Sequence, residues 1–338
     1  MIETCGQMAG VRMKKAGIAG GGLLMAAVFV WLSMRWFRGR EIGAAFGELV
    51  HSPWWILMMT VFYGLSFWMK AVAWRRYVAR EKEDRLSGYV YPLFVSLLVN
   101  HVLPIKLGDL ARTGMLVRMT RMGWEDALHS VAIMRLLDMV SLLLIGSIGA
   151  TLLGLSVSVS PWIQVALGLG AAGGLLAVSM YIRRMKTEGG KANPLIAVIQ
   201  RHGERLSTTI GSRRGVGIAV LTLGSWVLEG AVVFGVVHVL HLDVNWLQAV
   251  WANSMTIAGQ LFHITPGGIG TYEMTLTASL GVLGVAGVDG YTVALLSHGY
   301  KFVFAYAFGA VSLVLAAVTL AELKEWVGLR KIGRKNTE

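Results

Sequence analysis

The sequence predicts an all-α, polytopic membrane protein with six transmembrane helices and two broken, re-entrant helical hairpins arranged as an inverted repeat. The first reason is composition: 55% of the 338 residues are hydrophobic and only 15% are charged, whereas soluble domains carry about 25% charged residues. The second is that several apolar runs reach the roughly 18 residues that can cross a bilayer. The third is that two shorter runs end at proline and glycine breaks with matching spacing.

The apolar runs give the predicted spans, which lie at residues 17–35, 53–73, 127–152, 161–182, 215–241 and 291–319. The first run follows a basic segment, as in a signal peptide, but it is long for one and lacks a clear A-x-A cleavage site, so we interpret it as an uncleaved span. The predicted organisation is a cytoplasmic segment 1–16, a single membrane domain 17–320 with repeats at about 53–152 and 215–319, and a basic cytoplasmic tail 321–338.

Orientation follows from lysine and arginine, which concentrate in cytoplasmic loops. Basic residues follow the second span, from Lys70 to Arg85, and the fourth span, from Arg183 to Arg214, and they recur in the tail. The short segments 156–161, 242–245 and 286–291 contain neither lysine nor arginine. Both termini are therefore predicted to be cytoplasmic in a bacterial inner membrane. Arg35, Arg38 and Arg40 then fall outside, beside a predicted interfacial helix at Glu41–Val50.

The two short apolar runs, Tyr89–Pro104 and Trp246–Thr265, predict the hairpins. Their turns share the pattern H-x-x-P-x-x-x-G: the first contains His101, Pro104 and Gly108, and the second lies 162 residues later, at His263, Pro266 and Gly270. Basic residues flank the first hairpin and are absent from 242–300 around the second. The hairpins should therefore enter from opposite sides, as in transporters whose site lies where discontinuous helices meet.

The breaks themselves favour a polar site. Proline removes a backbone donor and glycine permits unusual turns, and the freed backbone groups must face protein or a wet cavity. Half-helix N-termini suit phosphate groups, and Gly267, Gly268 and Gly270 would admit a headgroup close to the backbone. The alternative is that these glycines only allow helices to pack closely.

Ionisable residues within the apolar segments extend this interpretation, because each costs about 2.5–3.5 kcal/mol to insert and so usually faces a bundle interior. Arg135 and Asp138 could instead form a structural ion pair, and Lys106 and Arg112 could reach the cytoplasmic headgroups. The predicted headgroup path consists of Asn100, His101, Pro104, Lys106, Gly108, Asp109, Arg112, Arg135, Asp138, Glu229, His263, Pro266, Gly267, Gly268, Gly270, Glu273, His298 and Lys301.

Three segments in order, N-H-V-L-P-I-K-L-G-D-L-A-R at 100–112, R-L-L-D at 135–138 and P-G-G-I-G-T-Y-E at 266–273, resemble the membrane region of the lysylphosphatidylglycerol synthase/flippase family, including its stand-alone members. The resemblance implies lipid handling, in well-known members the movement of an aminoacylated phospholipid. Where the family commonly has an arginine early in the last span, this chain has Lys301, which is not a bidentate phosphate clamp. About 19 residues follow the last span, so we expect no aminoacyl-transferase domain.

The predicted function is translocation of a phospholipid or an isoprenoid or hopanoid lipid. No G-x-x-x-x-G-K-[ST] motif occurs, so transport would be gradient-driven, facilitated or powered elsewhere. An intramembrane transferase using a pair such as His101 and Asp109, and a non-transporting accessory protein, are the alternatives. We expect no cofactor, no metal, since Cys5 is the single cysteine, and no nucleic acid. A homo-oligomer or lipid-pathway protein partners are left open.

Overall fold

The computed structural model describes residues 34–78, 85–103, 107–155, 212–260 and 265–328, and within these ranges the secondary structure is helical, without strands. The predicted spans 17–35 and 161–182 lie outside the described residues, except for Met34 and Arg35. Pro104, Lys106 and His263 also lie outside them.

Within the described ranges, four stretches of helix are long and apolar enough to cross a membrane. They are α3 (Pro53–Val78), α6 (Trp124–Leu152), α9 (Arg213–Glu229) continued by α10 (Ala231–Val239), and α13 (Gly287–Leu315). Each overlaps one of the predicted spans. The chain is therefore a multi-pass membrane protein.

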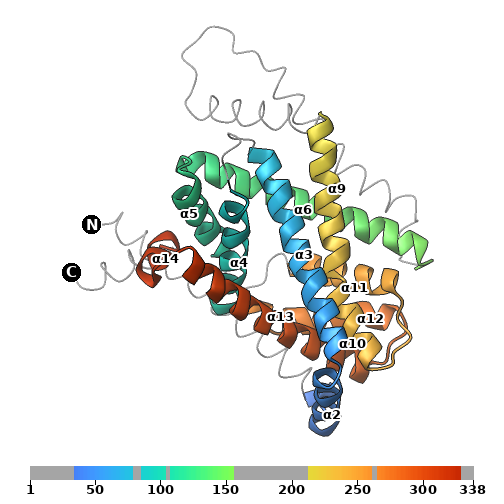
Figure 1. The fold of residues 1–338 in the computed structure, drawn as a ribbon. Helices are drawn as coiled ribbons and strands as arrows, with labels where there is room; N and C mark the ends of the chain where they lie inside the picture. Colours follow the sequence, from blue (N-terminus) through green and yellow to red (C-terminus); the bar gives the residue numbers. More distant parts are fainter. Residues whose placement is uncertain (1–33, 79–84, 104–106, 156–211, 261–264, 329–338) are drawn as a thin grey trace, which may run out of the picture.

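Both predicted breaks interrupt helices. The first separates α4 (Ser87–Val102) from α5 (Gly108–Thr120), and the second separates α11 (Trp246–Gly259) from the 3₁₀ turn η1 (Pro266–Gly268) and α12 (Thr271–Val282). Each half of the described chain thus runs from a long helix through a broken pair to another long helix. Helices α3 and α9, which begin the two halves, pack along each other (Figure 1). Their opposed orientation across a membrane stays a prediction.

Two short helices lie at the edges of the bundle. Helix α2 (Gly39–Val50) is amphipathic as predicted, with Ala45 and Leu49 buried and Phe46 exposed, although it begins at Gly39 rather than Glu41. Helix α13 ends at Leu315, before the predicted limit of 319, and α14 (Leu320–Trp326) follows, packed beside α5 (Figure 1). Described residues at the start of the predicted basic tail therefore belong to a capped helix that contacts the bundle.

Aromatic side chains fill the space between the first hairpin and the long helices. Phe67 of α3, Phe94 of α4 and Phe304 of α13 pack together, with ring centroids between 5.2 and 6.2 Å apart. Aromatic rings bury large apolar areas and prefer offset-stacked or edge-to-face contacts to face-to-face stacking. This cluster packs α4 against α3 and α13, and Phe67 also lines a cavity inside the bundle.

Candidate intramembrane site

A partly open cavity of about 160 Å³ lies where the two hairpins meet the long helices. Its lining comes from α3, α4, α5, α6, α9, α11, η1, α12 and α13. The predicted path residues that line it are Asn100, His101, Arg112, Arg135, Asp138, Glu229, Gly267, His298 and Lys301. The fold therefore brings together residues from both halves of the chain.

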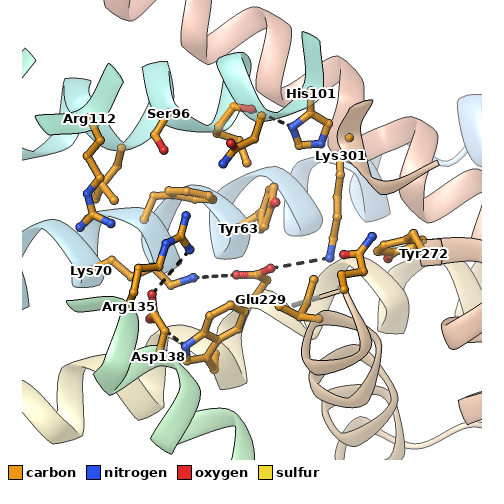
Figure 2. A pocket seen from close by; sticks show the side chains of 18 of the residues that line it. Tyr63, Lys70, Ser96, His101, Arg112, Arg135, Asp138, Glu229, Tyr272 and Lys301 are labelled. Atoms are coloured by element: carbon orange, nitrogen blue, oxygen red, sulfur yellow. Dashed lines mark hydrogen bonds and ion pairs between the residues drawn. The ribbon is translucent and has the colours of Figure 1, made fainter. Parts of the chain in front are cut away.

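A row of three charges crosses the cavity (Figure 2). The Nζ of Lys70 donates to Glu229 at 2.9 Å, and the Nζ of Lys301 lies 3.7 Å from the other oxygen of the same carboxylate. Lys301 also donates to the Oδ1 of Asn253 at 2.8 Å. All three charged side chains are buried. The carboxylate of Glu229 therefore forms ion pairs with two ammonium groups, those of Lys70 and Lys301.

Counting Lys70 with the cytoplasmic loop residues is wrong, whereas its position inside the predicted span 53–73 agrees with the structure. Helix α3 continues to Val78, and Lys70 is only 8% exposed. Its ammonium group lies 3.6 Å from the centre of the Trp226 ring, besides its bond to Glu229. A buried ammonium is tolerated when a counter-charge and an aromatic face replace its water.

Arg135 is held by the first hairpin. Its Nε and Nη2 donate to the carboxylate of Asp109 at 2.8–3.0 Å, a two-pronged contact between α6 and α5. The predicted partner Asp138 is farther away, at 3.9 Å, and accepts a hydrogen bond from the Nε1 of Trp226 at 3.0 Å. The guanidinium of Arg135 is therefore engaged mainly by Asp109.

Arg112 differs from the other cations. It is 3% exposed, so the alternative in which it reaches the headgroup region does not hold in this structure. Its guanidinium carbon lies 4.0 Å from the centre of the Trp74 ring, and its Nε has no hydrogen-bond partner among the described residues. No described carboxylate forms an ion pair with it.

Leaving aside Glu273 and His298, which bond to each other, the charges in and immediately around the cavity do not balance. The cations are Lys70, Arg112, Arg135 and Lys301, and the carboxylates paired with them are Asp109, Asp138 and Glu229. One positive charge remains without a partner among the described residues, and it belongs to Arg112. Burial of an unpaired charge is expensive, so an anion in this cavity would be strongly favoured.

The second break is fastened to α13. Gly267, Gly268 and Gly270 have positive φ angles of 62°, 78° and 85°, which other residues rarely adopt. Glu273 accepts the backbone N–H of Gly270 at 2.7 Å and contacts the Nδ1 of His298 at 2.7 Å. The Nε2 of His298 lies 3.0 Å from the carbonyl oxygen of Gly267. In this structure a carboxylate of the chain itself caps α12.

The first break is braced by Asn100, whose Oδ1 accepts the backbone N–H of Gly108 at 2.9 Å. A β-carbon on Gly108 would lie 2.3 Å from the carbonyl oxygen of Ser96 in α4. Gly108 therefore allows α5 to approach α4 closely. His101 next to Asn100 contacts the carbonyl oxygen of Leu97 at 2.8 Å and packs edge-on against Phe302.

Replacing Gly108 by alanine is expected to force α4 and α5 apart, because the clash is with backbone atoms that cannot rotate away. Overpacking of this kind costs about 1–3 kcal/mol, and thermal unfolding in detergent would measure the loss. Gly88→Ala is the matched control in the same helix pair, since its β-carbon would meet Thr120 at 3.6 Å, an ordinary contact. Equal stability of the two variants would contradict a close approach at Gly108.

Several site residues were not predicted, and they are Tyr63, Phe67, Lys70, Trp74, Trp226, Asn253, Gln260 and Tyr272. Some carried a signal. Tyr63, Phe67, Lys70 and Trp74 follow one another at spacings of 3 and 4 residues, which places them on one helix face. Asn253 is a polar residue inside an apolar hairpin arm. Within the described ranges no three His, Cys, Asp or Glu side chains gather as a metal site requires.

Membrane helices and broken hairpins around a buried, charged cavity define a class: helical membrane proteins with a polar site inside the bundle. The family described as "Lysylphosphatidylglycerol synthase TM region" matches residues 18–309, and this chain belongs to it. The chain is also similar to "Glycosyltransferase AglD" of Haloferax volcanii, with 21% identity over 351 residues covering 90% of this chain. The match covers 55% of that relative, so this chain spans about half of its length.

Proposed function

We propose that this protein moves a lipid with an anionic headgroup, a phospholipid or an isoprenoid-type phosphate, across a bacterial inner membrane. The observation that carries the proposal is Arg112: a buried guanidinium that faces the cavity and has no ion-pair partner among the described residues. The family description supports a role with lipids, since it names the membrane region of a phospholipid synthase.

The chemistry of Arg112 suits a phosphate group. A guanidinium offers planar, paired N–H donors that match the oxygen atoms of a phosphate, and its contact with Trp74 orients this plane. Lys301 and Lys70 lie on the same cavity and would add positive potential from the other side. Arg135 would act less directly, because Asp109 already occupies two of its nitrogen atoms.

The size of the cavity limits what enters it. At about 160 Å³, it is below the roughly 300 Å³ at which pockets for complete small-molecule ligands begin. A headgroup fits this space, but acyl or isoprenoid chains do not. We therefore propose that the headgroup crosses through the cavity while its chains stay in the surrounding lipid.

Two further expectations complete the proposal. The two hairpins would be inverted repeats that expose the cavity alternately to each side, as in other transporters with broken helices. The chain would have six spans with both termini in the cytoplasm, and it would not itself be an enzyme.

The similarity to a protein named glycosyltransferase favours a second candidate, a transferase acting on a membrane lipid. Such an enzyme needs an available acid or base. The cavity carboxylates are engaged instead, Glu229 by Lys70 and Asp138 by Trp226. We therefore place transport first.

Purified protein in vesicles of phosphatidylethanolamine and phosphatidylglycerol, with NBD-labelled phosphatidylglycerol as probe, tests the proposal. Without transport, dithionite reaches about half of the probe, the share in the outer leaflet; with transport, the quenched fraction should approach completion. NBD-labelled glucosylceramide, whose headgroup is uncharged, should move far more slowly. Equal movement of both probes, or of neither, would contradict the proposal, and a covalently altered lipid in mass spectra would favour the transferase.

A further inference from the structure

The turn of the second hairpin is tied to α13 at both of its ends by one pair of side chains. Glu273 holds the backbone N–H of Gly270, and His298 contacts the carbonyl oxygen of Gly267. The pair is joined by a 2.7 Å contact between the Nδ1 of His298 and the Oε1 of Glu273. Both residues are 3% exposed, so neither polar group can replace this contact with bulk water.

The hydrogen bonds require a specific number of protons. A carbonyl oxygen only accepts, so the Nε2 of His298 must carry the hydrogen that points to Gly267. The contact between Nδ1 and Oε1 then needs one more proton. Either an imidazolium donates to a carboxylate, or a carboxylic acid donates to a neutral imidazole. In both cases the pair holds one proton beyond those of a neutral histidine and an ionised glutamate.

From this geometry we infer that Glu273 and His298 form a proton-binding site that fastens the turn, and that lipid movement is coupled to its occupancy. Without the extra proton, the neutral imidazole has one hydrogen for two contacts. On Nε2 it leaves the Nδ1 lone pair facing a carboxylate at 2.7 Å, and on Nδ1 it leaves the Nε2 lone pair facing the carbonyl oxygen of Gly267 at 3.0 Å. The tautomer with its hydrogen on Nδ1 keeps the bond to Glu273 and releases Gly267. The coupling, though not the proton site itself, rests on the proposed transport function.

The ionisable and aromatic groups near Glu273 and His298 do not change the assignment of the extra proton to this pair. Tyr272 stacks on the His298 ring with centroids 4.2 Å apart, and His101 of α4 lies 6.4 Å away. Lys301, one turn along α13, points to Asn253 and to Glu229 of α9. The hydroxyl-bearing Tyr63 of α3 also lines the cavity. None of the hydrogen bonds described for these groups reaches a ring nitrogen of His298.

The charge balance links the proton to the headgroup. With the pair protonated, the cavity and its partner carboxylates carry one excess positive charge, that of Arg112. Loss of the proton adds one negative charge to the same region and cancels this excess. Binding of an anion and binding of the proton should therefore favour each other, and linkage makes this effect reciprocal. The headgroup and the proton would consequently move in the same direction.

The proton site can be tested without transport, with a spin label on the turn. Ile269 is exposed, so Ile269→Cys in a Cys5→Ser background gives one labelling position. With Glu273 and His298 both present, the label should be restrained at low pH and become mobile at high pH, because the extra proton that fastens the turn is then lost.

Two near-isosteric variants should abolish this transition in opposite directions. In Glu273→Gln, the amide oxygen can accept from Gly270 while the amide nitrogen donates to Nδ1, so the label should stay restrained at every pH. In His298→Asn, the side chain can still reach Glu273 but leaves the Gly267 carbonyl without its donor, so the label should be mobile throughout. His129→Gln, a histidine of α6 bonded to Tyr77, should keep the wild-type transition. A wild-type transition in either Glu273→Gln or His298→Asn, or none in the wild type, overturns the proton site.

The coupling is tested in the same vesicles with NBD-labelled phosphatidylglycerol. An acidic exterior should speed inward movement by about fivefold or more, the low end of common coupling strengths, and Glu273→Gln should remove this acceleration. If the mobility of the spin label depends on pH but the rate of lipid movement does not depend on the pH gradient, the coupling is wrong. If the probe does not move under any gradient, the proposed transport fails, and the label decides the proton site alone.

Discussion

Replacing Arg112 by glutamine is expected to slow movement of NBD-labelled phosphatidylglycerol by about 10- to 100-fold. A hydrogen bond to a charged group contributes about 1.5–3 kcal/mol, and each 1.4 kcal/mol is about tenfold in a binding constant. The thermal stability of the empty protein should not fall. The Nε of Arg112 has no hydrogen-bond partner among the described residues, and removing the charge of this side chain also removes the cost of burying it. Dithionite quenching and thermal unfolding in detergent measure the two effects separately.

Two variants control this experiment. Arg76→Gln removes an exposed arginine of α3, and it should leave transport at the wild-type rate. Arg112→Lys keeps the charge but loses the paired donors, so its rate should lie between wild type and Arg112→Gln. Wild-type transport by Arg112→Gln would remove this residue from headgroup binding. A large loss of stability would instead mean that Arg112 neutralises a group in the fold.

The helices could be predicted from the sequence because a bilayer forces backbone groups to bond within their own segment. The length of an apolar run is then close to the length of a helix, as for α6 and the combined α9 and α10. The breaks were predictable for a related reason, since Pro104 with Gly108 and Pro266 with Gly270 are local signals. The helix ends were less certain: α3 extends past residue 73 and α13 stops before 319.

The charge pairs could not be predicted in the same way, because they join helices far apart in the chain. Arg135 and Asp138 have the spacing of an ion pair on one helix, yet Arg135 bonds chiefly to Asp109, 26 positions earlier. Lys70 and Glu229 are 159 positions apart. The rule that lysine and arginine concentrate in cytoplasmic loops assigned Lys70 to a loop. That rule considers only the residue and its neighbours in the sequence, and it takes no account of an ion-pair partner in another helix.

Replacing Glu229 by glutamine should cause the largest loss of stability of any change in the site. The carboxylate lies between two buried ammonium groups, 2.9 Å from Lys70 and 3.7 Å from Lys301. Removing one partner of a buried ion pair costs about 3–5 kcal/mol, because an uncompensated charge is left behind. Here two charges lose their partner at once, so thermal unfolding in detergent should show a marked decrease. Glu41→Gln breaks a surface pair with Arg38 that is mostly exposed, and should cost about 0–1 kcal/mol.

The double variant Lys70→Met with Glu229→Gln distinguishes the cause of that loss. If the loss of stability comes from buried ammonium groups that have lost their carboxylate, removing Lys70 as well should restore part of the stability. Only Lys301 then remains without a carboxylate. Lys301 would keep its bond to the Oδ1 of Asn253 and its position near the ring of Tyr272. If the glutamine itself disturbs the packing at the junction of α9 and α10, the double variant should be no more stable than Glu229→Gln. That result would mean that Glu229 is needed for its shape and not for its charge.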